Sequence, residues 1–230
     1  MRFLLSALAW ILDPAHWAGP TGIGARLGEH LLYSLLALVL ATVIALPLGL
    51  WIGHTGRGRA IAIGTSGALR ALPSLGLLTF LAVALGVGIN GALLPSTIVL
   101  AVLAAPPILA GAYAGVEGID RDVVDGARAT GFSERQIVTA VEMPLAAPMV
   151  LGGIRSATLQ VIATATIAAY LGLGGLGRFI LDGLPVRDYS QMLAGAVLVT
   201  VLALAIDGLL LLLQRSLVTA GVRAATGVET

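Results

Sequence analysis

The chain has 230 residues, of which 58% are hydrophobic and 11% are charged, and its formal net charge is +1. A soluble domain usually carries about 25% charged residues, so this composition excludes a soluble monomer and predicts an integral membrane protein. Every basic side chain other than histidine is an arginine and there is no cysteine, which excludes a Walker-type phosphate site, a lysine Schiff base, disulfides and thiolate metal sites. The near-zero charge favours no nucleic-acid partner, and no His, Asp and Glu cluster has the spacing of a metal site.

The first apolar segment, Phe3–Leu12, is too short to cross a bilayer, which needs about 20 apolar residues. The following residues, Pro14-Ala15-His16-Trp17, make a poor signal-peptide cleavage site, although a signal peptide is the alternative. We therefore expect residues 1–29 to form an extracytoplasmic or interfacial segment.

Four later segments are long and apolar enough to span a membrane, namely residues 31–52, 93–115, 145–171 and 192–213. A fifth, residues 60–87, contains Arg70 and Pro73, and proline removes a backbone donor and bends a helix. We expect one span interrupted near Leu72-Pro73, with two separate pieces as the alternative. The fold class is therefore all-α, a polytopic transmembrane helical bundle of about five spans within residues 30–215.

Arginine and histidine are more frequent in the loops after the first and third spans and in the carboxyl-terminal tail than on the opposite side. Positive charge marks the cytoplasmic side of a membrane protein. This distribution predicts an amino terminus outside the cell, a cytoplasmic loop at residues 117–144 and a cytoplasmic tail at residues 216–230.

The loop 117–144 is a long polar stretch in which two short helices are expected. The first begins near Asp120 or Asp122, since acids suit a helix amino end, and stops at Gly131. The second opens at Ser133, with Gln136 three residues later as in a capping box, and ends at Met143-Pro144. Its apolar stripe needs a partner, either this chain's own bundle or another protein; the stripe consists of Phe132, Ile137 and Val141.

The same loop resembles one found in permease subunits of bacterial ATP-binding-cassette importers, which reads E-A-A, three residues, G, nine residues, I-x-L-P. This chain has Asp125-Gly126-Ala127, then Gly131 and then Val141-Glu142-Met143-Pro144 at the same spacings. Gly126 is the departure that matters, because glycine costs about 1 kcal/mol relative to alanine inside a helix.

The resemblance implies that the loop is a coupling helix that docks in a groove of a separate ATPase subunit. ATP and magnesium would bind that subunit, so this chain is expected to have no cofactor and to be no enzyme. The residues implied in coupling are Asp125, Gly126, Ala127, Gly131, Phe132, Ser133, Glu134 and Pro144.

Two further regions resemble permeases for the osmoprotectants glycine betaine, choline and carnitine. They are residues 70–75 in the second span, and residues 152–158, 163–169 and 172–177 in and after the fourth. The resemblance implies an inner-membrane importer that pairs with a second copy or a sister permease and receives substrate from an extracytoplasmic binding protein. Methionine permeases share the G-x-G-G-L-G stretch, so the fold is expected to be of the methionine-permease type, and another small solute such as methionine is the alternative substrate.

Polar residues on the fourth span predict an inward-facing surface. Ser156, Gln160 and Thr164 recur every four residues on one helix face, and Thr166 lies on a neighbouring stripe. Because unpartnered polar groups are costly in hydrocarbon, they should either form interhelical hydrogen bonds or line the translocation path.

Three charges fall within predicted spans, namely Arg70, Arg155 and Asp207. Charged residues inside a membrane usually pair with one another, so we expect Asp207 to pair with Arg155 or Arg70, as a structural contact or as a gate.

Other motifs carry less weight. Gly64-Thr65-Ser66-Gly67 resembles the G-x-S-G of an intramembrane serine protease, but all three histidines precede Ser66, whereas such an enzyme needs a later one as base. The G-x-x-x-G spacings at Gly49/Gly53 and Gly111/Gly115 are given little weight because glycine is common in this chain.

Overall fold

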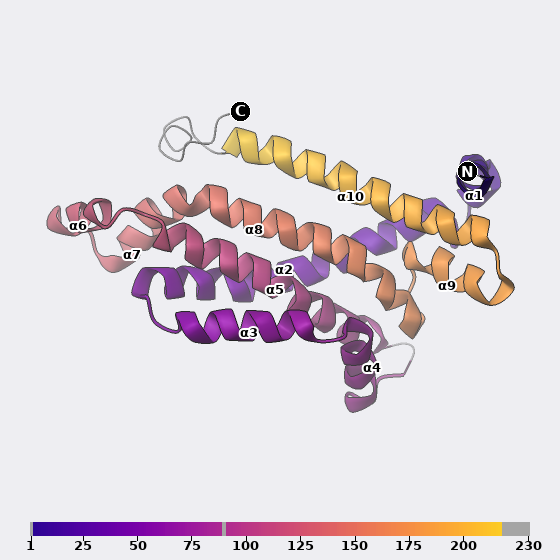
Figure 1. Cartoon of the computed structure of the whole chain (residues 1–230), viewed down its shortest axis with the longest axis horizontal. Coiled ribbons are helices and arrows are strands. Elements are labelled where there is room, and N and C mark those ends of the chain that lie inside the picture. The colour runs from indigo at the N-terminus through magenta and orange to yellow at the C-terminus, as the bar shows by residue number, and fades with distance from the viewer. Residues whose placement is uncertain (1, 89–90, 218–230) are drawn as a thin grey trace. The chain divides into compact units, whose positions relative to one another are not determined.

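The computed structural model describes residues 2–88 and 91–217, with the backbone alone described at Arg2, at Arg70 and over residues 215–217. These residues form helices and connecting turns, with no strand in the described part, which confirms the predicted all-α class (Figure 1). The elements in chain order are α1 (Arg2–Leu12), η1 (Pro14–His16), α2 (Ile23–Thr55), α3 (Arg59–Ala71), α4 (Ser74–Ala84), α5 (Leu93–Glu117), α6 (Arg121–Ala129), α7 (Glu134–Gln136), η3 (Ile137–Glu142), α8 (Met143–Thr164), η4 (Ala165–Leu171), α9 (Gly177–Val186) and α10 (Tyr189–Leu217).

The helices long and apolar enough to cross a membrane agree with the predicted spans. Within the described ranges there are four such stretches, or five if α3 and α4 together make one broken span. The helices extend past the predicted apolar segments at their ends, since backbone hydrogen bonding continues into polar residues that hydropathy does not count. The four stretches are Ile23–Thr55, Leu93–Glu117, Glu134–Leu171 and Tyr189–Gln214.

The second span is interrupted at Leu72-Pro73, as the sequence predicts. Helix α3 ends at Ala71, and Pro73 has an extended backbone (φ −68°, ψ 111°) directly before α4. A residue before proline is disfavoured in the helical conformation, which accounts for the break at Leu72. With 13 and 11 residues, the two pieces measure about 20 Å and 17 Å, so neither alone crosses a hydrocarbon core of about 30 Å.

The prediction of a separate second loop helix ending at Met143-Pro144 is wrong. Helix α7 continues through the π-helix η3 into α8, and the Met143 N–H donates to the carbonyl of Val138, five residues back. The missing amide of Pro144 falls where the hydrogen-bond pattern returns to the α-helical one, so the helix passes through this proline. The fourth span also changes geometry after Thr164, where a 3₁₀-helix runs to Leu171.

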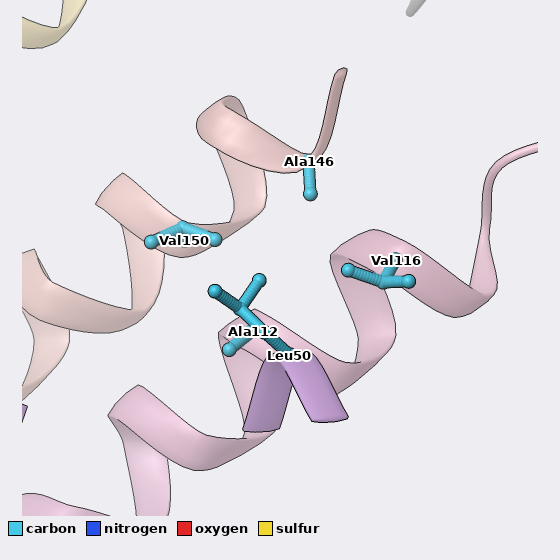
Figure 2. Packing of buried hydrophobic residues seen from close by; sticks show 5 residues of the cluster. All are labelled: Leu50, Ala112, Val116, Ala146 and Val150. Carbon is cyan, nitrogen blue, oxygen red and sulfur yellow. The ribbon is translucent and has the colours of Figure 1, made fainter. Parts of the chain in front are cut away.

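The chain divides into two compact units, and the division falls within α2, α5, α8 and α10. One unit contains the described residues of 1–40, 72–103 and 158–206, and the other contains those of 41–71, 104–157 and 207–230. In the second unit a buried apolar cluster joins α2, α5 and α8, with Leu50 directed toward side chains of both other helices (Figure 2). Its members are Leu50, Ala112, Val116, Ala146 and Val150.

Glycines let these three helices approach closely. A Cβ atom on Gly49 would lie 2.6 Å from the Cβ of Ala112, and one on Gly111 would lie 2.6 Å from the carbonyl oxygen of Met149. Real Cβ atoms do not come this close to other atoms, so a side chain at either position would push the helices apart. The low weight given to the two G-x-x-x-G spacings is therefore wrong, because both mark helix contacts.

In the first unit, a carboxylate on α2 holds the glycine-rich turn that follows η4. Oε2 of Glu29 accepts hydrogen bonds from the Gly175 N–H at 2.8 Å and from Nη1 of Arg26 at 3.0 Å. A Cβ atom on Gly174 would lie 1.8 Å from the same oxygen. A side chain at this point would therefore displace the Glu29 carboxylate from the turn.

Candidate coupling site

Helix α6 carries the first part of the predicted coupling motif and has the predicted ends. Oδ1 of its N-cap, Asp120, accepts a hydrogen bond from the Asp122 N–H at 3.0 Å. After Ala129 the chain turns through Gly131, whose φ of +91° is a left-handed conformation that suits glycine, and the Phe132 N–H donates to the carbonyl of Ala127 at 3.2 Å. The residues Asp125, Gly126 and Ala127 lie within this helix.

Helix α7 follows after a short exposed turn. Oε1 of Gln136 accepts hydrogen bonds from the backbone N–H of Ser133 at 2.9 Å and from its hydroxyl at 2.8 Å, so the predicted capping partners are in contact. Such contacts satisfy groups that a helix leaves open at its amino end. Figure 1 shows α6 and α7 together beside the end of α5 and the start of α8.

An arginine fixes α6 to α7. Nε and Nη2 of Arg128 donate to the two carboxylate oxygens of Glu134 at 2.8 and 2.9 Å, and its Nη1 donates to Oδ1 of Asp125 at 2.9 Å. The hydrogen bonds to Glu134 and then to Asp125 raise the pKa of the Arg128 guanidinium above its already high ordinary value. This paired geometry orients the two short helices relative to each other.

The predicted coupling residues gather on one exposed segment, with one exception. Gly131, Phe132, Ser133 and Glu134 are exposed, and 42% of Phe132 is accessible. Pro144 lies apart from them as the second residue of α8. The apolar stripe divides, because Ile137 is fully buried in this chain while Phe132 is exposed.

A histidine that the sequence analysis did not select joins this segment to α2. Nδ1 of His54, at the carboxyl end of α2, lies 2.8 Å from Oε2 of Glu142, and its Nε2 lies 3.1 Å from Oε2 of Glu134. His54 and Glu142 border a cavity of about 280 Å³ formed by the ends of α2, α5 and α6. The sequence gives only a weak signal for this contact, which is the charged residue Glu142 within an apolar run.

The two threonines among the predicted path residues form hydrogen bonds within their own span. The Thr164 hydroxyl donates to the carbonyl of Gln160 at 2.7 Å, and the Thr166 hydroxyl donates to that of Ala163 at 2.9 Å. Hydroxyls often satisfy themselves in this way within helices. Ser156 is exposed, Gln160 is partly buried, and Thr166 lies on η4 instead of α8.

Two of the three predicted intramembrane charges form an ion pair. Nε of Arg155 lies 2.5 Å from Oδ1 of Asp207, and its Nη2 lies 2.7 Å from Oδ2, so the pair is bidentate. Both side chains are partly buried, on α8 and α10 within the same unit. The side chain of Arg70 lies outside the described residues.

Comparison with known proteins gives the chain a family. The family described as "Binding-protein-dependent transport system inner membrane component" matches residues 45–219, which is more than half of the chain. The choline transport system permease protein OpuBB of Bacillus subtilis is 36% identical over 195 residues, covering 85% of this chain and 88% of that protein. The glycine betaine/carnitine/choline transport system permease protein OpuCB of the same organism is 35% identical over 198 residues, covering 86% and 89%.

Solved structures show the same fold at lower identity. An inward-facing form of the MetNI methionine ABC transporter matches with a TM-score of 0.72 at 22% identity, covering 91% of this chain and 97% of that one. An amino acid ABC transporter matches with a TM-score of 0.64 at 18% identity, covering 84% and 92%. The importer-permease fold expected from the loop motif is thereby confirmed, and the chain belongs to the family of binding-protein-dependent transport system inner membrane components.

Proposed function

We propose that this chain is the permease subunit of an ATP-driven importer for quaternary-ammonium osmoprotectants such as choline, glycine betaine and carnitine. The observation that carries the proposal is its identity of 35–36% over most of its length to permeases named for these solutes. Methionine is the competing solute, because a methionine transporter has the same fold. That likeness, at 22% identity, concerns the fold alone.

In this proposal the exposed segment around Gly131 docks in a groove of a separate ATPase subunit, which binds ATP and magnesium. The exposed Phe132 ring and the Arg128–Glu134 pair support this role, because they offer an apolar anchor and a fixed orientation. Loop 117–144 and the tail 216–230 would then face the cytoplasm, and residues 1–29 the outside.

A second copy or a sister permease completes the pathway, and an extracytoplasmic binding protein delivers the solute. Four polar residues of the fourth span are proposed to line that path, namely Ser156, Gln160, Thr164 and Thr166. The exposure of Ser156 supports this. Because the chain belongs to a transport family, the serine protease alternative is not retained.

Uptake into vesicles that contain the reconstituted permease, ATPase and binding protein tests the substrate. Labelled glycine betaine or choline should accumulate with ATP inside the vesicles, and unlabelled carnitine should compete while methionine should not. Accumulation of methionine, with none of the quaternary amines, would overturn the substrate assignment.

A pull-down of the ATPase tests the docking site. Gly131→Val should weaken binding, because valine is strained at a φ of +91° although no atom lies within 4 Å of its Cβ position. Gly64→Val is the matched control, since that site is equally open and lies on α3. Undiminished capture of the ATPase by the Gly131 variant would count against docking at this turn.

A further inference from the structure

If the segment around Gly131 docks in an ATPase, its movement has to be transmitted to the helices that cross the membrane, including α2. Helix α7 passes through η3 into α8 without a break, so a displacement of the turn at Gly131 reaches α8 through the backbone. Helix α2 has no such covalent continuity with α7. The apolar cluster around Leu50 joins α2 to α8, and a direct link from α2 to α7 has to run through side chains.

His54 makes that contact from the last turn of α2. One ring nitrogen faces Glu142 at 2.8 Å and the other faces Glu134 at 3.1 Å, so a single rigid ring bridges η3 and α7. Beyond Glu134 the contacts continue through Arg128 to Asp125 on α6. These contacts form a series of five side chains whose charges, when ionised, alternate in sign: Glu142, His54, Glu134, Arg128 and Asp125.

Burial distinguishes the two arms of this bridge. The side chain of Glu142 is 5% exposed and that of His54 is 13% exposed, whereas that of Glu134 is 57% exposed. A buried carboxylate is costly without a partner, and among the described residues His54 supplies the hydrogen bond that Glu142 accepts. The inner arm therefore anchors the ring, and the outer arm reaches the surface segment that the ATPase would move.

We infer that His54 is a positioning residue that transmits the movement of the coupling segment to α2. This inference rests on the proposed function. It predicts a loss of coupling when the ring is removed: the ATPase still binds and hydrolyses ATP, but less of the hydrolysis drives transport.

The test measures ATP hydrolysis and uptake of labelled glycine betaine in the same vesicles, with the full complex reconstituted. His54→Ala should retain hydrolysis while uptake per ATP falls by about fivefold or more, the low end of typical coupling between sites. A purely structural role would lower both rates together, through fewer assembled complexes, and leave the ratio unchanged. An unchanged ratio would overturn the inference.

Further variants keep the test decisive. Glu134→Gln alters the outer partner and leaves the buried Glu142 contact in place, so it carries the test if His54→Ala does not assemble, and it should lower the same ratio. Because it also weakens the Arg128 pair, it is compared with Asp125→Asn, which loosens Arg128 but leaves both His54 contacts in place and should lower the ratio less. His54→Gln retains a donor and should recover part of the coupling. Arg57→Ala, three residues further along on an exposed turn, is the matched control with an unchanged ratio.

The wild-type complex separates the two ideas. If it neither captures the ATPase nor takes up a quaternary amine, the proposed function fails. If it transports normally and neither His54→Ala nor Glu134→Gln changes uptake per ATP, the role of His54 alone fails.

Discussion

At the scale of single residues, the helix contacts depend on atoms that are absent as much as on side chains that are present. Gly49 and Gly111 face a neighbouring helix so closely that a Cβ atom would overlap it. Van der Waals packing of this kind drives helix association in membranes, where apolar side chains gain nothing by leaving lipid.

Gly111→Ala should therefore destabilise the chain by about 1–3 kcal/mol, as overpacking does in cores. The new Cβ would meet the backbone oxygen of Met149, which cannot rotate away. Thermal unfolding in detergent measures the effect. Gly152→Ala on α8, where nothing lies within 4 Å, is the control and should be neutral or slightly stabilising. Equal midpoints for both variants would show that the close approach carries no stability.

Asp207→Asn removes the charge that pairs with Arg155 and leaves a guanidinium without its carboxylate inside a predicted span. We expect a lower yield of folded protein in the membrane, measured by fluorescence-detected size exclusion. The reversed pair, Arg155→Asp with Asp207→Arg, should recover yield. Normal yield of the single variant with lost uptake would instead identify the pair as a gate.

The two ion-pair systems show which side-chain contacts a sequence can predict. The pairing of Arg155 with Asp207 could be predicted because a charge within an apolar run needs a partner and few candidates exist. His54 and Glu142 are 88 residues apart, and His54 lies at a helix end where a polar residue needs no explanation. Only the folded arrangement of α2 and η3 brings them together.

At the scale of elements, the features set by local chemistry were predicted well. The N-cap of α6, its glycine stop and the break at Pro73 each depend on a few neighbouring residues. The continuity of α7, η3 and α8 and the change to a 3₁₀-helix at Ala165 were missed. These depend on which backbone acceptor each amide finds in the packed structure, and residue types alone do not specify it.

Gly126→Ala should strengthen α6 by about 0.5–1 kcal/mol, because alanine loses less backbone entropy and meets no atom within 4 Å at this position. Hydrogen exchange of the α6 amides should slow by roughly two- to fivefold, following that free-energy change. The exchange rates of α9, in the other unit, serve as the internal reference. Faster exchange in α6 would mean that the glycine is required for the helix to form as it does.

At the scale of the whole molecule, the proposed topology rests on charge asymmetry, and the lack of cysteine allows it to be tested by cysteine labelling. In the proposed orientation Arg57 faces the cytoplasm and Val186, which is 73% exposed, faces outward. With single substitutions Val186→Cys and Arg57→Cys, a membrane-impermeant maleimide should label intact spheroplasts at position 186 only. Position 57 should react after the cells are opened. The reverse pattern would invert the proposed orientation.

The tight fit between Gly174 and Glu29 has an evolutionary consequence. Any side chain at position 174 would overlap the carboxylate that holds the turn after the fourth span. The atoms in the way are the ends of the flexible Glu29 and Arg26 side chains, so alanine or serine at 174 would displace the Glu29 carboxylate from its hydrogen bond with the Gly175 N–H. The two sites should therefore covary across an alignment as residues in contact do. Frequent alanine at 174 beside an intact glutamate at 29 would refute this linkage.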